Sequence, residues 1–193
     1  MKDEAIISEL VSAVSHDYQR ISEVLTDRFS SFSALARAEL YEIDSAIDNL
    51  SVASYIKIAS ELAVRRVTDR FKFGRAHTDE EIENYLRAVF LCKAVETVYL
   101  ISIDSSDRVI SSDNVCDGTI NRLGIIPRRL LEIAHRRGAR KVIIAHNHPG
   151  GIAEPSRDDI STSAAVMEAF CASGIEILKN YIVSDGEIKS FLS

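Results

Sequence analysis

Three side chains of the types that bind zinc lie close together in the sequence: His146, His148 and Asp159. The two histidines extend a short apolar run, residues 141–145, whose composition is typical of a buried strand. Because side chains alternate along a strand, both imidazoles share one face and can reach one ion at roughly 2.0–2.1 Å. Two histidines and a carboxylate leave a fourth tetrahedral position for water, as in a catalytic zinc site.

The carboxylate lies in the first turn of a predicted helix. Pro155 and Ser156 open this helix after a Pro-Gly-Gly turn, and Gly174 is typical of its carboxyl end. A carboxylate in the first turn interacts favourably with the positive end of the helix dipole. The preceding loop is long enough to fold back toward the histidines. Asp158 is an equally acidic neighbour, so the local sequence leaves open which of the two aspartates is the ligand.

These residues also have interpretations that need no metal. His146 and His148 can be ordinary polar residues at the end of a strand. Ser156 and Asp159 fit the Ser-x-x-acid pattern that starts helices, in which each side chain bonds a backbone N–H group of the other residue. For Ser156, the local sequence favours a capping role at least as much as a chemical one.

The combination His146-x-His148-Pro149 followed by Ser156-x-x-Asp159 resembles the JAMM motif of JAB/MPN metalloproteases. The sequences His-Asn-His-Pro-x-Gly and Pro-Ser-x-x-Asp resemble those of the bacterial RadC family even more closely. The resemblance covers roughly residues 78 to 191. It includes Gly118-Thr119-Ile120, Pro127-Arg128 and a glutamate-led strand over residues 96–104.

The resemblance implies that His146, His148 and Asp159 ligate Zn²⁺, although Fe²⁺, Mn²⁺ or Ni²⁺ can occupy sites of this kind. It also implies that Glu96 accepts a proton from the water that zinc activates and passes it to a leaving amine. Ser156 would hydrogen-bond the developing oxyanion. Without the resemblance, Glu96 is interpreted as a solvated residue between a helix and a strand. Glu154 is then the alternative candidate for the proton acceptor, because Glu154 lies nearer to the histidines in the sequence.

The chain departs from the family pattern at several positions. The family usually has serine where Gly150 stands and an acid where Arg129 stands. An Asp-His pair commonly precedes the last apolar strand of the family, and the matching positions here are Lys179 and Asn180. Because groups around metal ligands orient them, loss of such a partner can weaken metal affinity or activity by about 10–100-fold.

The elements that must position these residues divide the chain near residues 66–77. Residues 1–76 are predicted to form a small helical domain with a basic linker at 65–75, and residues 77–193 a JAB/MPN-like metal domain. The metal domain is predicted to be α/β, with a β-sheet flanked by helices. Helical spacing of apolar residues recurs through 5–14, 18–29, 33–39 and 52–64. The expected order thereafter is a helix from 79 toward 95, strands 96–103 and 108–112, helix 127–137, strand 141–147, helix 156–173 and strand 175–183.

The amino-terminal segment resembles the helical domain that precedes the metal domain in RadC proteins, which is similar to a helix-hairpin-helix. That fold often grips DNA phosphates through glycine-rich turns. Here the corresponding turn, residues 47–51, has no glycine, and Asp44 and Asp48 make it acidic. The net charge of −6 also disfavours nonspecific binding of nucleic acid, although basic residues within 128–141 offer a local basic face.

Composition predicts a cytoplasmic protein with a substantial core. The chain has 193 residues, of which 46% are hydrophobic. No apolar run approaches the roughly 20 residues that span a bilayer, and the charged start is unlike a signal peptide, so no membrane partner is expected. The three scattered cysteines, without a C-x-x-C pair, indicate neither a disulfide framework nor a thiolate zinc site. The same absence argues against a nucleobase deaminase.

These observations predict a zinc-dependent hydrolase of the JAMM type that cleaves a peptide or isopeptide bond in a peptide or protein substrate. The alternative is a DNA repair or recombination accessory protein whose metal domain is structural or dormant. A nuclease is less favoured, because phosphodiester hydrolysis commonly uses two metals held by a cluster of carboxylates. The sequence leaves the scissile bond and the oligomeric state undetermined.

Overall fold

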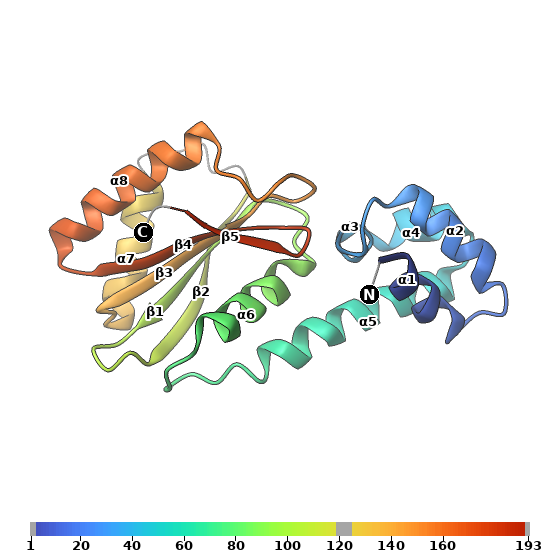
Figure 1. Cartoon of the computed structure of the whole chain (residues 1–193), viewed down its shortest axis with the longest axis horizontal. Coiled ribbons are helices and arrows are strands. Elements are labelled where there is room, and N and C mark those ends of the chain that lie inside the picture. The colour runs from blue at the N-terminus through green and yellow to red at the C-terminus, as the bar shows by residue number, and fades with distance from the viewer. Residues whose placement is uncertain (1–2, 119–124, 192–193) are drawn as a thin grey trace.

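The structure, a computed structural model, describes residues 3–118 and 125–191. Thr119 and Ile120, which contribute to the family resemblance, lie outside the described residues. A helical region comes first and is followed by a sheet with helices on both faces (Figure 1). The helical region contains α1 (Asp3–Ser12), α2 (Tyr18–Arg28), α3 (Phe32–Arg37), α4 (Leu40–Ile47) and α5 (Leu50–Thr68). The remaining elements are α6 (Asp79–Leu91), β1 (Thr97–Ile103), β2 (Val109–Asp117), α7 (Ile125–Arg137), β3 (Lys141–Asn147), α8 (Arg157–Ser173), β4 (Glu176–Ser184) and β5 (Glu187–Phe191).

The helical region has a hydrophobic core of its own, to which each of its five helices contributes. This core includes Val11, Leu25, Leu35, Ile43 and Ile56. Burial of an apolar stripe from each amphipathic helix is the main source of stability for such short helices.

Two features of the helical region differ from the sequence prediction. Helix α4 was not predicted, because its apolar pattern spans only two turns and its capping box starts with Glu39 instead of serine or threonine. Helix α5 continues to Thr68, into the predicted linker. Arg65 and Arg66 are good helix formers and lie in the last turn, where positive charge stabilises the helix dipole.

The five strands form one mixed sheet in the order β2-β1-β3-β4-β5. Strand β1 is antiparallel to both β2 and β3, β3 is parallel to β4, and β5 folds back antiparallel to β4. Strand β5 was not predicted because, as an edge strand, it alternates weakly between exposed and half-buried residues. Strand β2, the other edge, continues to Asp117 instead of ending near residue 112.

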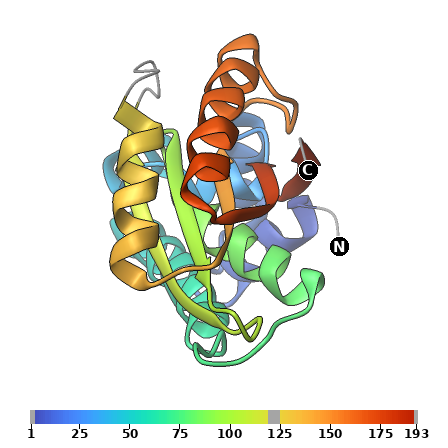
Figure 2. The same ribbon diagram turned by 90° about the vertical axis from the view of Figure 1, so that its left-hand side faces the viewer.

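Helices cover both faces of the sheet, which confirms the predicted α/β class (Figures 1 and 2). On one face, α7 and α8 pack Leu130 and Phe170 against strand residues such as Leu100. On the other face, α6 packs Leu86 against strand residues such as Tyr181. Strand β3 is therefore covered on both sides, and its carboxyl end presents consecutive side chains to opposite faces.

Within residues 3–118 and 125–191, no helix combines the length and apolar character that a bilayer crossing requires.

Candidate metal site

The carboxyl end of β3 positions both histidines. His146 pairs with Val98 of β1 and with Ile182 of β4, so its backbone is fixed on both sides. His148 follows directly after the strand, and its backbone N–H donates to the carbonyl of Val183 at 2.9 Å, which extends the pairing with β4. As expected from strand alternation, the two rings lie on one face, and their Nε2 atoms are 3.2 Å apart.

The first turn of α8 delivers Asp159 to the histidines. Ser156 is the N-cap, and its Oγ accepts a hydrogen bond from the Asp159 N–H at 3.1 Å. In return, Asp159 Oδ2 accepts from the Ser156 N–H at 2.8 Å and from its hydroxyl at 2.6 Å. Asp159 also lies 3.3 Å from each histidine, through Oδ1 to His146 and through Oδ2 to His148. The capping pair is therefore present, and it orients the carboxylate toward the histidines.

The three side chains have the spacing of metal ligands. The Nε2 atoms of the two histidines are 3.2 Å apart. Each of them lies 3.3 Å from an Asp159 carboxylate oxygen, which is Oδ1 for His146 and Oδ2 for His148. Tetrahedral zinc with bonds of 2.0–2.1 Å separates its ligand atoms by roughly 3.3–3.4 Å. The triangle of donors therefore fits one zinc ion. A set of two imidazoles and one carboxylate also suits other divalent first-row metals.

Burial and hydrogen bonding prepare Asp159 to act as a ligand. The side chains of His146, His148 and Asp159 are 9%, 16% and 10% exposed. Burial by itself raises the pKa of Asp159, but hydrogen bonds from His146 and Ser156 outweigh it and hold that pKa well below its usual range. The carboxylate is therefore ionised at neutral pH, which is the state that binds a metal.

The loop after β3 fixes the orientation of the second histidine. His148 Nδ1 lies 3.1 Å from the carbonyl oxygen of Ile152. Because a carbonyl only accepts hydrogen bonds, Nδ1 carries the proton and Nε2 is left with a free lone pair for a metal. The Ser184 hydroxyl lies 2.9 Å from the His148 carbonyl and 2.8 Å from that of Gly151, and it holds the loop to β4. Ser184 could not be identified from the sequence, because nothing in its local pattern distinguishes it from other serines at strand ends.

The competing acids lie outside the cluster. Asp158 is exposed and is not part of the group formed by His146, His148 and Asp159. Glu154 is exposed and forms an ion pair with Lys189 of β5. The choice between neighbouring aspartates, which the sequence left open, is thus decided by the direction in which the first turn of α8 points each side chain.

Glu96 lies immediately before β1 and is half-buried. In the pairing of β1 with β3, Val98 lies opposite His146. Continuing this register by two residues brings Glu96 level with His148, and it shares a face with Val98 because side chains alternate. The register is compatible with a role for Glu96 beside the three candidate ligands.

Asn147 fixes the segment that carries Glu96. Its side chain points to the opposite face from the histidines and is buried, with only 3% of the residue exposed. Its Oδ1 accepts a hydrogen bond from the Thr97 N–H at 2.7 Å, and its Nδ2 lies 3.3 Å from the Val95 carbonyl. Asn147 thus holds the backbone on both sides of Glu96. Strand alternation accounts for its direction, but no local sequence pattern indicates this role.

We expect Asn147→Ala to lower the free energy of unfolding by about 1–3 kcal/mol, because the buried Thr97 N–H loses its acceptor. Chemical denaturation checks this value. Asn114→Ala is the matched control, since Asn114 is exposed and its side chain bonds the nearby Asp117, and its effect should stay within about 0.5 kcal/mol. Equal effects of the two substitutions would contradict the proposed anchoring by Asn147.

The two positions where the chain departs from the Asp-His pair behave differently. Lys179 faces away from the candidate site and pairs with Asp79 at 2.6 Å. Asn180 is buried and lines a small cavity together with His146 and Asp159. Among the described residues, its Nδ2 has no hydrogen-bond partner. The departure therefore places an amide, instead of an imidazole, next to the candidate ligands.

Comparison with known proteins gives concordant matches. Residues 76–193 match the family model described as a RadC-like JAB domain. A UPF0758 protein of Nitrosococcus oceani is 33% identical over 174 residues, which are 89% of this chain and 77% of the relative. A UPF0758 protein of Chromobacterium violaceum is 32% identical over 86% of this chain and 75% of the relative. A UPF0758 protein of Photobacterium profundum is 32% identical over 74% of this chain and 65% of the relative. None of these names states an activity.

Proposed function

Because this chain belongs to the family of RadC-like JAB-domain proteins, we propose that it is a zinc-dependent hydrolase of the JAMM type that cleaves peptide or isopeptide bonds. The observation that carries the proposal is the convergence of two imidazole nitrogens and one ionised carboxylate at the spacing of metal ligands. Ser156, next to the cluster, is exposed, so a substrate can approach from this side.

The roles that we propose rest on the cluster of candidate ligands and on the strand register. His146, His148 and Asp159 would hold zinc, which supplies Lewis-acid chemistry and activates water near neutral pH. Glu96, level with His148 in the strand register, would accept a proton from the attacking water and deliver it to the leaving amine.

The Ser156 hydroxyl has a single hydrogen, and in this structure that hydrogen is directed to Asp159 Oδ2 at 2.6 Å. To stabilise a developing oxyanion, Ser156 must turn this hydrogen from the carboxylate to the substrate. Its Oγ can continue to accept the bond from the Asp159 N–H, so the helix cap survives the exchange. We therefore assign Ser156 two successive hydrogen-bond acceptors.

The turn between α4 and α5 does not favour the DNA-associated alternative. Asp48 has a φ of 52° and occupies the left-handed conformation that glycine would otherwise supply. The Asn49 side chain already accepts the hydrogen bond of the Val52 N–H at the start of α5. A phosphate at this turn would meet an acidic surface and a capped helix end, so the peptide hydrolase is preferred.

Removal and restoration of the metal test the proposal. Internally quenched peptides and lysine-linked isopeptides should be hydrolysed by the zinc-loaded protein, with a loss of about 100-fold or more after chelation and recovery on adding zinc. Circular dichroism should show a retained fold, because the hydrophobic cores are built without the site. Hydrolysis that persists after chelation, or a zinc-loaded protein that cleaves neither class, would contradict the proposal.

A further inference from the structure

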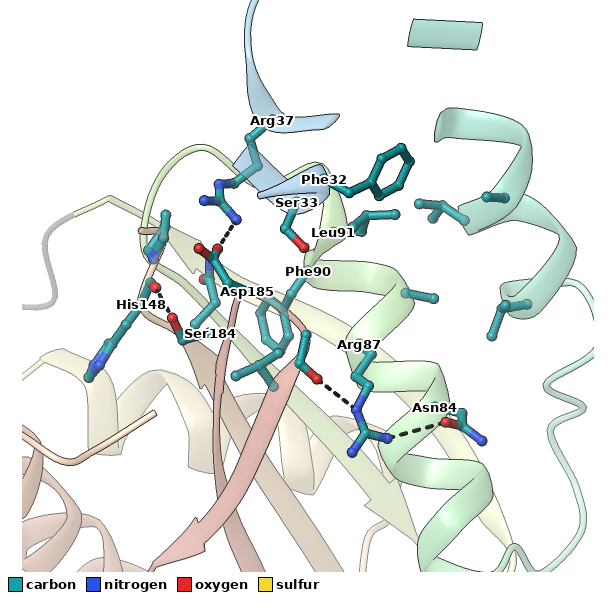
Figure 3. A pocket seen from close by; sticks show the side chains of 18 of the residues that line it. Phe32, Ser33, Arg37, Asn84, Arg87, Phe90, Leu91, His148, Ser184 and Asp185 are labelled. Carbon is teal, nitrogen blue, oxygen red and sulfur yellow. Dashed lines mark hydrogen bonds and ion pairs between the residues drawn. The ribbon is translucent and has the colours of Figure 1, made fainter. Parts of the chain in front are cut away.

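A cleft of about 550 Å³ lies between the helical region and the sheet (Figure 3). Its walls come from α3 and α5 on one side and from α6 and the β4–β5 turn on the other. Residues Asn147, His148 and Pro149, at the end of the metal-binding strand, also line it. A volume of roughly 300–1,000 Å³ is typical of ligand sites, which often lie between domains.

The lining of the cleft combines an apolar surface with positive charge. Its apolar side chains include Phe32, Val64, Val67, Phe90, Leu91 and Pro149. Its charged side chains are four arginines, Arg37, Arg66, Arg70 and Arg87, and one aspartate, Asp185. The whole chain carries a net charge of −6, so the charge of the cleft lining is opposite in sign to that of the protein as a whole.

Two of the arginines form contacts between the elements that line the cleft. Arg37 of α3 pairs with Asp185 at 2.5 Å and thereby joins the helical region to the β4–β5 turn. Arg87 of α6 donates to the Gly186 carbonyl at 3.0 Å and to Asn84 at 3.2 Å, and it forms an ion pair with Glu83 at 3.4 Å. Figure 3 shows the contacts Arg37–Asp185 and Arg87–Asn84 as dashed lines.

The other two arginines are available to a ligand. Arg66 lies in the last turn of α5, and Arg70 lies two residues beyond the end of that helix. Both are exposed, and neither forms an ion pair within the part of the chain that the structure describes. They lie four residues apart and both border the cleft, so one acidic ligand can meet both of them.

The cleft is connected to the candidate metal site through the backbone. The Ser184 hydroxyl, in the lining, contacts the carbonyls of His148 and Gly151. His148 contributes to the lining of the cleft, and in Figure 3 its ring points away from the cleft.

We propose that this cleft binds an acidic, partly apolar peptide segment of the substrate protein. The inference rests on the hydrolase proposed for the metal site and adds the substrate class. Aliphatic walls suit apolar side chains, and arginines suit carboxylates, which they bind with paired hydrogen bonds. A nucleic-acid duplex is too wide for a cavity of this volume, and the acidic remainder of the protein repels phosphates.

The test compares two pools of decapeptides on the immobilised 193-residue chain. In the acidic pool, half of the positions hold Asp or Glu and half hold Leu, Val or Phe; in the basic pool, Lys and Arg replace the acids. Retained peptides are quantified by mass spectrometry. The wild-type protein should retain the acidic pool about tenfold or more over the basic pool, and Arg66→Glu/Arg70→Glu should lose that preference.

The matched control is Arg28→Glu/Arg65→Glu, which makes the same change of charge at two exposed arginines outside the cleft. It should retain the acidic pool to within about twofold of wild type. Equal retention of both pools, or equal effects of the two double variants, would overturn the proposal. A single-stranded oligodeoxynucleotide that binds in place of the acidic pool, with dependence on Arg66 and Arg70, would also overturn it.

The same measurement on the chelated protein separates this inference from the proposed function. Binding needs no turnover, so the chelated protein should still retain the acidic pool. Retention together with a zinc-loaded protein that hydrolyses nothing would support the cleft and contradict the hydrolase. Hydrolysis that is identical in wild type and in Arg66→Glu/Arg70→Glu, without retention of the acidic pool, would support the hydrolase and contradict the cleft.

Discussion

Replacing His148 with alanine is expected to reduce the bound metal from about one ion per chain to less than about 0.1. The substitution removes one of three converging donors, and the remaining imidazole and carboxylate complete only half of a tetrahedral set. Elemental analysis of protein purified without added metal checks this expectation. The fold should persist, because His148 lies at the end of a strand and belongs to none of the hydrophobic cores.

Asp158→Asn provides the matched control for the metal measurement. Asp158 is the exposed neighbour of Asp159, and its removal changes the local charge without removing a candidate ligand. This variant should keep its full metal content. A His148→Ala protein that retains the metal, or an Asp158→Asn protein that loses it, would contradict the assignment of the three ligands.

Glu96→Gln is expected to lower the rate of hydrolysis by about 10²–10⁴-fold while leaving the metal content unchanged. Glutamine keeps the size of the side chain but cannot accept a proton from water near neutral pH. The variant therefore separates proton transfer from metal binding, which His148→Ala cannot do. Hydrolysis is measured on the peptide or isopeptide substrate that the zinc-loaded wild type cleaves, and metal content is measured on the same preparation.

The control for this substitution is Glu154→Gln. Glu154 competes with Glu96 on sequence proximity, but it is exposed and paired with Lys189, so its replacement should leave hydrolysis within about twofold of wild type. Full activity in Glu96→Gln would remove this residue from the mechanism. Loss of metal in Glu96→Gln would instead make the residue a ligand.

Most of the sheet domain could be predicted from the chain because its elements have strong local signals. The residues of β3 are apolar between charges and a Pro-Gly-Gly turn, and the predicted strand has the observed bounds Lys141–Asn147. The capping box at Thr78 marks the start of α6 as expected. Helix α4 and strand β5 were missed because each is short, and their stability comes from packing and from pairing with β4.

The sequence by itself determined the α/β class and the shared face of the two histidines, because strand alternation and helix capping act over a few residues, and its motifs indicated the family. Tertiary structure decided which aspartate lies with the two histidines. Asp159 and Asp158 differ only in direction, and Glu96 and Asn147 lie about fifty residues apart, brought together by the register of β1 on β3. The arginine-lined cleft likewise joins helices and turns from distant parts of the chain. Such contacts depend on how whole elements pack, and local sequence patterns do not encode that packing.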